Sequence, residues 1–163
     1  MEIIDFLNHS PAQGISLFGT TGNFLHFDVE EREKLVSFGI KRSRKPVAVG
    51  ISHSTLDVTE HLAEHAAGAG ASFALVLPPY YFRYTEPQLE HFYLKLGEKA
   101  AKFLPLYLYN IPFFTQALPV GLAHRLLTSG LYQGIKDSSG DPSYLEALRD
   151  TATALVVGND TAL

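Results

Sequence analysis

Short apolar segments alternate along the chain with longer segments in which apolar residues recur every three or four positions. Short apolar runs that end in Gly, Pro or polar residues are typical of buried strands, and the longer period is typical of helices packed along one side. The sequence therefore predicts alternating strands and helices. The predicted strands are mostly apolar, as in a parallel sheet covered on both faces, and occupy residues 14–19, 46–51, 72–77, 105–109, 132–136 and 154–158.

Four predicted helices begin directly after a residue whose side chain can cap the first turn. These residues are Asp28, Ser54 or Thr55, Thr85 and Asp141, and the helices that follow them cover residues 29–41, 56–67, 86–103 and 142–150. Gly68 and Gly70 come after the second of these helices. They predict a C-terminal cap and a turn, not a phosphate-binding loop.

Strand and helix alternation of this kind is compatible with two architectures, a doubly wound open sheet and a (β/α)8 barrel. Both place ligands at the carboxyl ends of the strands. Length favours the open sheet, because a complete barrel usually has about 250 residues and this chain has 163. The pattern predicts a single α/β domain over residues 1–163 and leaves the two architectures open.

Composition narrows the class of function. With 46% hydrophobic residues, 18% charged residues and a net charge of -4, the chain can form one core but has no basic stripe for nucleic acid or an anionic membrane. The absence of cysteine excludes disulfides and thiolate chemistry. Neither a signal-peptide pattern nor an apolar run of about 18 residues occurs. We expect a cytoplasmic protein whose partner is a small molecule, with no nucleic acid or membrane involved.

Polar residues concentrate at the ends of the predicted strands. The segments are GTTG at 19–22, PPYY at 78–81, YNIP at 109–112, IKDSSG at 135–140 and GND at 158–160. Lys136 is the unusual member, because it stands at the end of an otherwise apolar strand. The carboxyl edge of the sheet is therefore the predicted site.

In a pleated strand, Lys136 shares its face with Gly134 and Ser138, whereas Asp137 points the other way and is not its automatic ion-pair partner. Apolar surroundings disfavour the charged form of an amine, and a neutral amine can attack a ketone to form a Schiff base. The alternative is that Lys136 only ends its strand and extends past the next helix into solvent.

Neighbouring strand ends carry groups that would serve a Schiff base. Tyr109 ends the preceding strand, and its hydroxyl can both donate and accept a proton. The turn from Gly19 to Gly22 offers the hydroxyls of Thr20 and Thr21 together with backbone N–H groups. These groups could hold a carboxylate.

The motifs GTTG, PPYY, YNIP and GIKDSSGD, in this order, resemble those of the dihydrodipicolinate synthase and N-acetylneuraminate lyase family of pyruvate-dependent class I aldolases. The resemblance covers essentially the whole chain. It implies a (β/α)8 barrel in which Lys136 forms an imine with pyruvate or another 2-oxo acid, Tyr109 shuttles protons, and Thr20 and Thr21 hold the carboxylate. Tyr81 would match a tyrosine that reaches into the neighbouring subunit's site. The resemblance further implies a homo-oligomer, a dimer or tetramer, and no cofactor beyond the covalent imine.

Two positions depart from the family pattern. Asn23 follows GTTG where the family usually has glutamate, and Phe114 stands where the synthases have an arginine for a second carboxylate. Without that guanidinium a bidentate carboxylate clamp is lost. A 2-keto-3-deoxy sugar acid is therefore favoured as substrate, with dihydrodipicolinate synthesis or a catalytically inactive fragment as alternatives. The resemblance also implies that this chain corresponds to about strands 2 to 7 of the barrel, so we expect an incomplete barrel without its first and eighth strands.

Two further hypotheses stay open: a domain that binds a 2-oxo acid without turnover, and an unrelated doubly wound domain with a phosphorylated ligand. His61 and His65 lie one turn apart on a predicted helix, and we expect a solvated helix face there and no metal site. His53 could touch substrate or belong to an ordinary loop. Phe113 and Phe114 could form a wall of the pocket or pack on the next helix.

Overall fold

The computed structural model describes residues 2–151 and 154–159, and its strands form a single parallel sheet. All six predicted strands are confirmed, while Asp160 of the GND segment lies outside the described residues. Their bounds are β1 Ile15–Leu17, β2 Val47–Gly50, β3 Phe73–Val76, β4 Leu106–Asn110, β5 Gly134–Asp137 and β6 Ala154–Val157.

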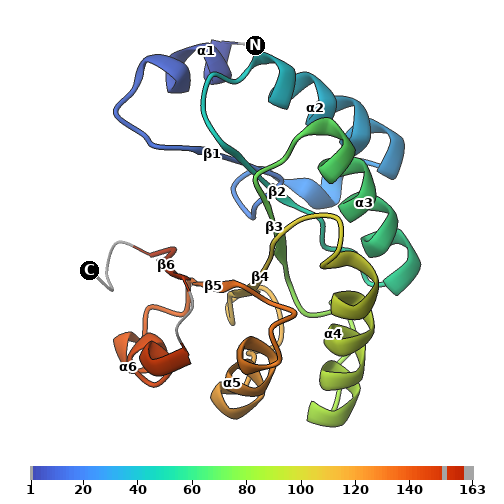
Figure 1. Ribbon diagram of the computed structural model, residues 1–163, viewed down its shortest axis with the longest axis vertical. Coiled ribbons are helices and arrows are strands. Elements are labelled where there is room, and N and C mark those ends of the chain that lie inside the picture. The colour runs from blue at the N-terminus through green and yellow to red at the C-terminus, as the bar shows by residue number, and fades with distance from the viewer. Residues whose placement is uncertain (1, 152–153, 160–163) are drawn as a thin grey trace.

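The order of the strands decides between the two predicted architectures. The strands pair in chain order from β1 to β6, and every pair is parallel. A doubly wound sheet would reverse its order at a switch point. Figure 1 shows instead a curved sheet with helices following one another along its outer side. The fold is thus an incomplete (β/α)8 barrel, and the open-sheet alternative is wrong.

Helices fill the connections between strands. They are α1 Glu2–His9, α2 Val29–Arg42, α3 Leu56–Ala69, α4 Glu86–Ala100, α5 Val120–Thr128 and α6 Pro142–Glu146, with short 3-10 turns at Phe24–His26 and Arg149–Thr151. The predicted cap of α2 is confirmed, since the Glu31 backbone N–H donates to Asp28 at 2.8 Å and the Asp28 N–H donates to Glu31 at 3.0 Å. At α3 the cap position is Thr55, whose N–H donates to His53 Nδ1 at 3.1 Å. His53 is therefore a loop residue that supports a helix start.

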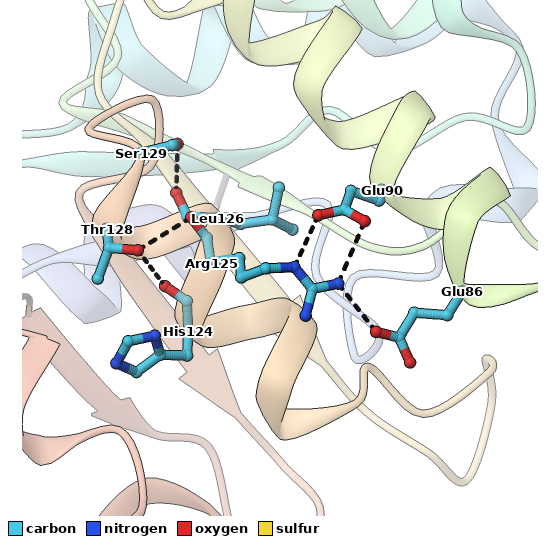
Figure 2. A network of polar contacts seen from close by, with 7 residues as sticks. All are labelled: Glu86, Glu90, His124, Arg125, Leu126, Thr128 and Ser129. Atoms are coloured by element: carbon cyan, nitrogen blue, oxygen red, sulfur yellow. Dashed lines mark hydrogen bonds and ion pairs between the residues drawn. The ribbon is translucent and has the colours of Figure 1, made fainter.

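The sequence pattern did not predict α5, because Pro119 at its cap position has no side-chain acceptor for the first turn. Arg125 joins this helix to α4: its Nε donates to Glu90 at 2.8 Å and its Nη2 donates to Glu86 at 2.9 Å (Figure 2). These hydrogen bonds, first that to Glu90, raise the pKa of Arg125. The ion pairs fix α5 beside α4 on the outer side of the barrel.

Three helix ends differ from the prediction by two residues or more. Helix α4 ends at Ala100 instead of reaching residue 103. Helix α3 continues to Ala69, so Gly68 lies in its last turn and only Gly70, at φ 96°, forms the C-terminal cap. Helix α6 ends at Glu146 instead of reaching residue 150, although Asp141 does cap it by accepting from the Ser143 N–H at 2.9 Å.

The core lies between the sheet and the outer helices. Along each strand, alternate side chains point to this layer, and Val49, Val76, Leu108 and Ile135 there are at most 2% exposed. The other set of side chains faces the concave side, where Val156 is 37% exposed. The sheet therefore separates a packed face from a face open to ligands.

Candidate active site

Lys136 and Tyr109 occupy paired positions on neighbouring strands. The register of β4 and β5 sets Tyr109 opposite Lys136 and Asn110 opposite Asp137. The Lys136 Nζ lies 4.4 Å from the centroid of the Tyr109 ring, so the amine rests on the ring face. Tyr109 is 4% exposed, which keeps the amine beside a buried surface.

A third strand end, that of β1, completes the arrangement. The Thr20 Oγ1 lies 3.2 Å from the Tyr109 hydroxyl, with either oxygen able to donate. A hydroxyl pair at this distance can pass a proton in either direction. The amine, the tyrosine and the threonine thus come from three strand ends that are far apart in sequence.

These groups line one open cleft of about 640 Å³ on the concave side. Its lining includes the predicted Gly19, Thr20, Thr21, Gly22, Tyr109 and Lys136, together with Ser16, Ile111, Phe113, Phe114, Ser138, Gly158 and Asn159. Lys136 is the one cationic side chain among these lining residues. Phe113 and Phe114 are 74% and 71% exposed, so they form a wall of the cleft and do not pack on the next helix.

The glycine-threonine turn supplies fewer free backbone donors than its sequence suggests. The Gly22 N–H donates to the Gly19 carbonyl at 3.0 Å and the Asn23 N–H donates to the Thr20 carbonyl at 3.1 Å. Asn23 adopts φ 51°, a left-handed conformation that asparagine tolerates better than most residues. An anion at this turn would therefore meet the hydroxyls of Thr20 and Thr21 and the N–H groups of the same two residues.

Tyr81 lies outside the cleft that holds Lys136. It borders a neighbouring pocket of about 380 Å³ that also touches Thr20 and Phe114. Its side chain is 91% exposed and its backbone has φ 83°. Within one copy of the chain, Tyr81 thus shares a pocket with Thr20 but is not brought into the cleft with Lys136 and Tyr109.

Asp137 faces away from the amine, as its place in the pleat predicts. It accepts from Asn110 Nδ2 at 2.7 Å and from Ser139 Oγ at 2.6 Å. Asn110 in turn accepts from the Leu118 N–H at 3.0 Å. This buried network ties the ends of β4 and β5 together and leaves Lys136 without a carboxylate partner among residues 2–151 and 154–159.

The sequence pattern did not identify Asn110 or Arg32 as buried polar residues that support the site. Asn110 is 1% exposed and Arg32 is 3% exposed. Asparagine directly after a strand is common in loops, and an arginine near the start of an amphipathic helix is usually solvated. Only the tertiary contacts reveal that both are buried.

The two histidines of α3 contact α2. His61 Nε2 pairs with the Glu33 carboxylate, and His65 Nε2 lies 3.0 Å from the Glu33 backbone carbonyl and 3.0 Å from Ser37 Oγ. The face that carries them is thus a helix-to-helix contact as well as a polar surface. Within the described part of the chain, no group of three His, Cys, Asp or Glu side chains is arranged to hold a metal ion.

A parallel barrel sheet with a polar cleft at the carboxyl ends of the strands places the chain in the class of (β/α)-barrel proteins. The profile of the Dihydrodipicolinate synthetase family matches residues 1–161, and the chain belongs to this family.

Curated relatives include two kinds of family member. The chain is 29% identical over 149 residues to the 2-dehydro-3-deoxy-D-gluconate/2-dehydro-3-deoxy-phosphogluconate aldolase of Picrophilus torridus, covering 89% of this chain and 55% of that protein. It is 31% identical over 152 residues to the 4-hydroxy-tetrahydrodipicolinate synthase of Pseudomonas putida, covering 91% and 51%. The chain spans about half the length of the curated relatives it matches.

Solved structures agree with the fold. The 2-keto 3-deoxygluconate aldolase from Picrophilus torridus superposes with a TM-score of 0.92 at 25% identity, covering 98% of this chain and 59% of that one. A prophage protein of the dihydrodipicolinic acid synthase family from E. coli K12, in complex with pyruvate, gives 0.88 at 29% identity, covering 96% and 55%.

Proposed function

We propose that the chain carries the site of a pyruvate-dependent aldolase or lyase that works through a Schiff base on Lys136. The supporting observation is the Lys136 amine on the face of Tyr109, whose hydroxyl pairs with Thr20 in the same cleft. The family assignment is consistent with this chemistry.

The proposed reaction begins when the neutral Lys136 amine adds to the ketone carbon of a 2-oxo acid. The resulting carbinolamine loses its hydroxyl as water, with Tyr109 donating the proton, and an imine remains on Nζ. In the cleavage direction, Tyr109 accepts the proton of the hydroxyl next to the breaking carbon–carbon bond. An aldehyde leaves, and the enamine of pyruvate takes up a proton before hydrolysis. No cofactor is required, because the imine itself accepts the electron pair.

The substrate carboxylate would be bound by the turn at the end of β1. Thr20 and Thr21 line the cleft, and their two hydroxyls and two backbone N–H groups are donors suited to an anion. Thr20 then has two roles, since its hydroxyl also meets Tyr109. Through Thr20, binding of the carboxylate and proton transfer would be linked.

For the second substrate we favour a 2-keto-3-deoxy sugar acid over the dicarboxylic product of the synthase reaction. Apart from Lys136, the lining of the cleft offers no cation to a second carboxylate, and Phe114 adds an apolar surface. An uncharged, hydroxylated aldehyde needs hydrogen bonds and does not need a guanidinium clamp. Replacement of Phe114 by Arg is expected to shift preference toward aldehydes that carry a carboxylate, measured as the ratio of kcat/KM values.

We further propose that the working form is a homo-oligomer in the cytoplasm in which Tyr81 reaches the site of a second copy. Its high exposure and its place outside the lining of the Lys136 cleft fit a side chain that acts between copies. Within the described residues, the helices are too short or too polar to cross a membrane. Analytical ultracentrifugation of the wild type and Tyr81→Ala tests the assembly, and a wild-type monomer would contradict it.

The decisive test is intact-mass spectrometry after incubation with pyruvate and borohydride, followed by peptide mapping. A single reduced adduct on Lys136, absent from Lys136→Met, is expected. Lys102→Met is a matched control, because the Lys102 Nζ also lies on an aromatic ring, 4.8 Å from the Phe103 centroid, but outside the cleft. A folded wild-type chain that gives no adduct, or an adduct that survives in Lys136→Met, would refute the proposal.

A further inference from the structure

Arg32 on α2 is a buried arginine without an ion-pair partner among the described residues. Its Nη1 donates to the Ser52 carbonyl at 3.0 Å and its Nη2 donates to the Gly50 carbonyl at 2.8 Å. Its Nε is buried and has no hydrogen-bond acceptor within the part of the chain that the structure describes. Burial lowers the pKa of the Arg32 guanidinium. Keeping a charge in such surroundings costs free energy. Other favourable contacts of the guanidinium must therefore offset this cost.

Two phenylalanine rings enclose the guanidinium. The Arg32 Cζ lies 5.5 Å from the ring centroid of Phe18 and 5.5 Å from that of Phe24. A planar guanidinium can stack on aromatic faces and donate from its edge at the same time, which an ammonium cannot do. Phe24 also packs edge-to-face on Tyr80, with 5.9 Å between centroids. Phe24 therefore packs on Arg32 and on Tyr80.

These two rings flank the turn that holds the reactive hydroxyl. Phe18 directly precedes Gly19, and Phe24 follows Asn23, so the guanidinium contacts both ends of the segment that carries Thr20. Stacking on both rings fixes the separation of the two ends of the turn. The turn cannot shift as a unit without breaking contacts to Arg32.

The backbone at the start of this turn needs such support. Phe18 has φ 54°, a left-handed conformation that is unfavourable for an aromatic residue. Its carbonyl packs so closely on β2 that a Cβ at position 50 would lie 2.0 Å from the Phe18 oxygen. Arg32 donates to the carbonyl of the same Gly50. It thus holds together the two backbone segments whose close approach sets the path of the turn.

We infer that Arg32 is a positioning residue that keeps the Thr20 hydroxyl within reach of Tyr109. It touches neither the cleft nor the reacting groups. Its effect would pass through Phe18 and Phe24 to the turn, and from Thr20 to the Tyr109 hydroxyl at 3.2 Å. The inference deepens the proposed function and rests on it for its catalytic consequence, while the structural part can be measured without any substrate.

The first experiment is hydrogen exchange with mass spectrometry on the unliganded chain. In Arg32→Met, we expect peptides covering residues 18–24 to exchange about tenfold faster or more, while peptides of β4 and β5 keep the wild-type rate. The matched control is Arg42→Met, which removes an exposed arginine from the other end of α2 and its ion pair with Asp5. Unchanged exchange at 18–24, or an equal increase throughout the chain, would overturn the inference.

The second experiment is a double-mutant cycle with Thr20→Val, using the rate of pyruvate adduct formation. Arg32→Met is expected to slow adduct formation by about tenfold to a hundredfold in the wild-type background, and by less than about twofold once Thr20→Val has removed the hydroxyl. Equal factors in both backgrounds would show that Arg32 acts on general stability and would refute the positioning role.

Two further cases must be distinguished, a variant that does not fold and a wild-type chain that forms no adduct. Should Arg32→Met not fold, Arg32→Lys takes its place, because it keeps the charge and a donor but loses the stacking plane; it should show the same two effects at smaller size, and wild-type behaviour in both would overturn the inference. Should the wild type form no adduct, the proposed function fails, and the hydrogen-exchange result alone decides whether Arg32 holds the turn.

Discussion

Replacing Asn110 by Ala should destabilise the chain far more than an asparagine substitution of the same kind on the surface. Asn110 donates to the Asp137 carboxylate at 2.7 Å and accepts from the Leu118 N–H at 3.0 Å, and all three groups are buried. Alanine leaves a carboxylate oxygen and a backbone N–H without a partner and without access to water. Unsatisfied buried groups are expensive even where the hydrogen bonds themselves contribute modestly.

The magnitude follows from these two contacts. A hydrogen bond to a charged group contributes about 1.5–3 kcal/mol, and an orphaned buried N–H costs about 1–3 kcal/mol. We therefore expect Asn110→Ala to lower the free energy of unfolding by about 2.5–6 kcal/mol. At about 2–4 °C per kcal/mol for a chain of this size, the Tm should fall by about 5–24 °C.

Asn8→Ala is a matched control, because Asn8 also makes two hydrogen bonds through its side chain. It donates to the Arg42 carbonyl at 3.2 Å and accepts from the Arg44 N–H at 2.9 Å, but both contacts are exposed. Water can replace them, so the loss should stay below about 1 kcal/mol. Urea unfolding followed by circular dichroism measures both variants. Equal losses for Asn110→Ala and Asn8→Ala would refute the reasoning that burial determines the cost.

Two further predictions concern the site and the response to acid. In Gly158→Ala the new Cβ would lie 2.1 Å from Ser138 Oγ and 2.8 Å from Lys136 Cε, so adduct formation with pyruvate should slow about a hundredfold as the lysine is displaced. The hydrogen bond from Arg125 lowers the pKa of Glu90; this contribution to stability is present above the ordinary carboxyl pKa and is lost as pH falls through the folded value. Urea unfolding of Arg125→Met should therefore vary less with pH between about 5 and 3 than that of the wild type.

Each of these has a control of the same chemistry elsewhere in the chain. Gly68→Ala introduces a Cβ with no heavy atom within 4 Å, so it should leave adduct formation unchanged; slowing equal to that of Gly158→Ala would contradict the steric argument. Arg149→Met removes an exposed pair with Glu146 and should keep the wild-type pH dependence. An acid response in Arg125→Met that matches wild type would contradict the assignment to Glu90.

Local patterns were sufficient to predict the strands and most helix starts, because both depend on neighbouring residues. Apolar runs marked the strands, and Asp28 marked the start of α2 through its own side chain. Helix α5 was not predicted, because it is stabilised by contacts of Arg125 with Glu86 and Glu90 on α4 and not by a capping side chain. The choice between barrel and open sheet also lay beyond local patterns, because it depends on which strands pair.

For the site, the sequence predicted positions along the strands but not burial. Strand-end positions predicted that Lys136, Tyr109 and Thr20 share one edge of the sheet, and all three line one cleft. The pleat predicted that Asp137 points away from the amine, and Asp137 accepts from Asn110 instead. What the sequence could not show is which polar residues are buried. Arg32 has the sequence context of an ordinary solvated helix residue. Its position between two rings results only when the turn folds back onto α2.

The alternation along the sheet also bears on how the chain could be redesigned. Lys136 and Asp137 are neighbours in sequence, yet one faces the open concave side and the other a buried polar network. A combinatorial library confined to concave-facing positions such as Ser16, which lines the cleft, and Val156, which pairs with Lys136, would vary the chemical surroundings of the amine while leaving the helix-facing core intact. Libraries drawn over contiguous stretches of sequence would instead lose most of their members to misfolding.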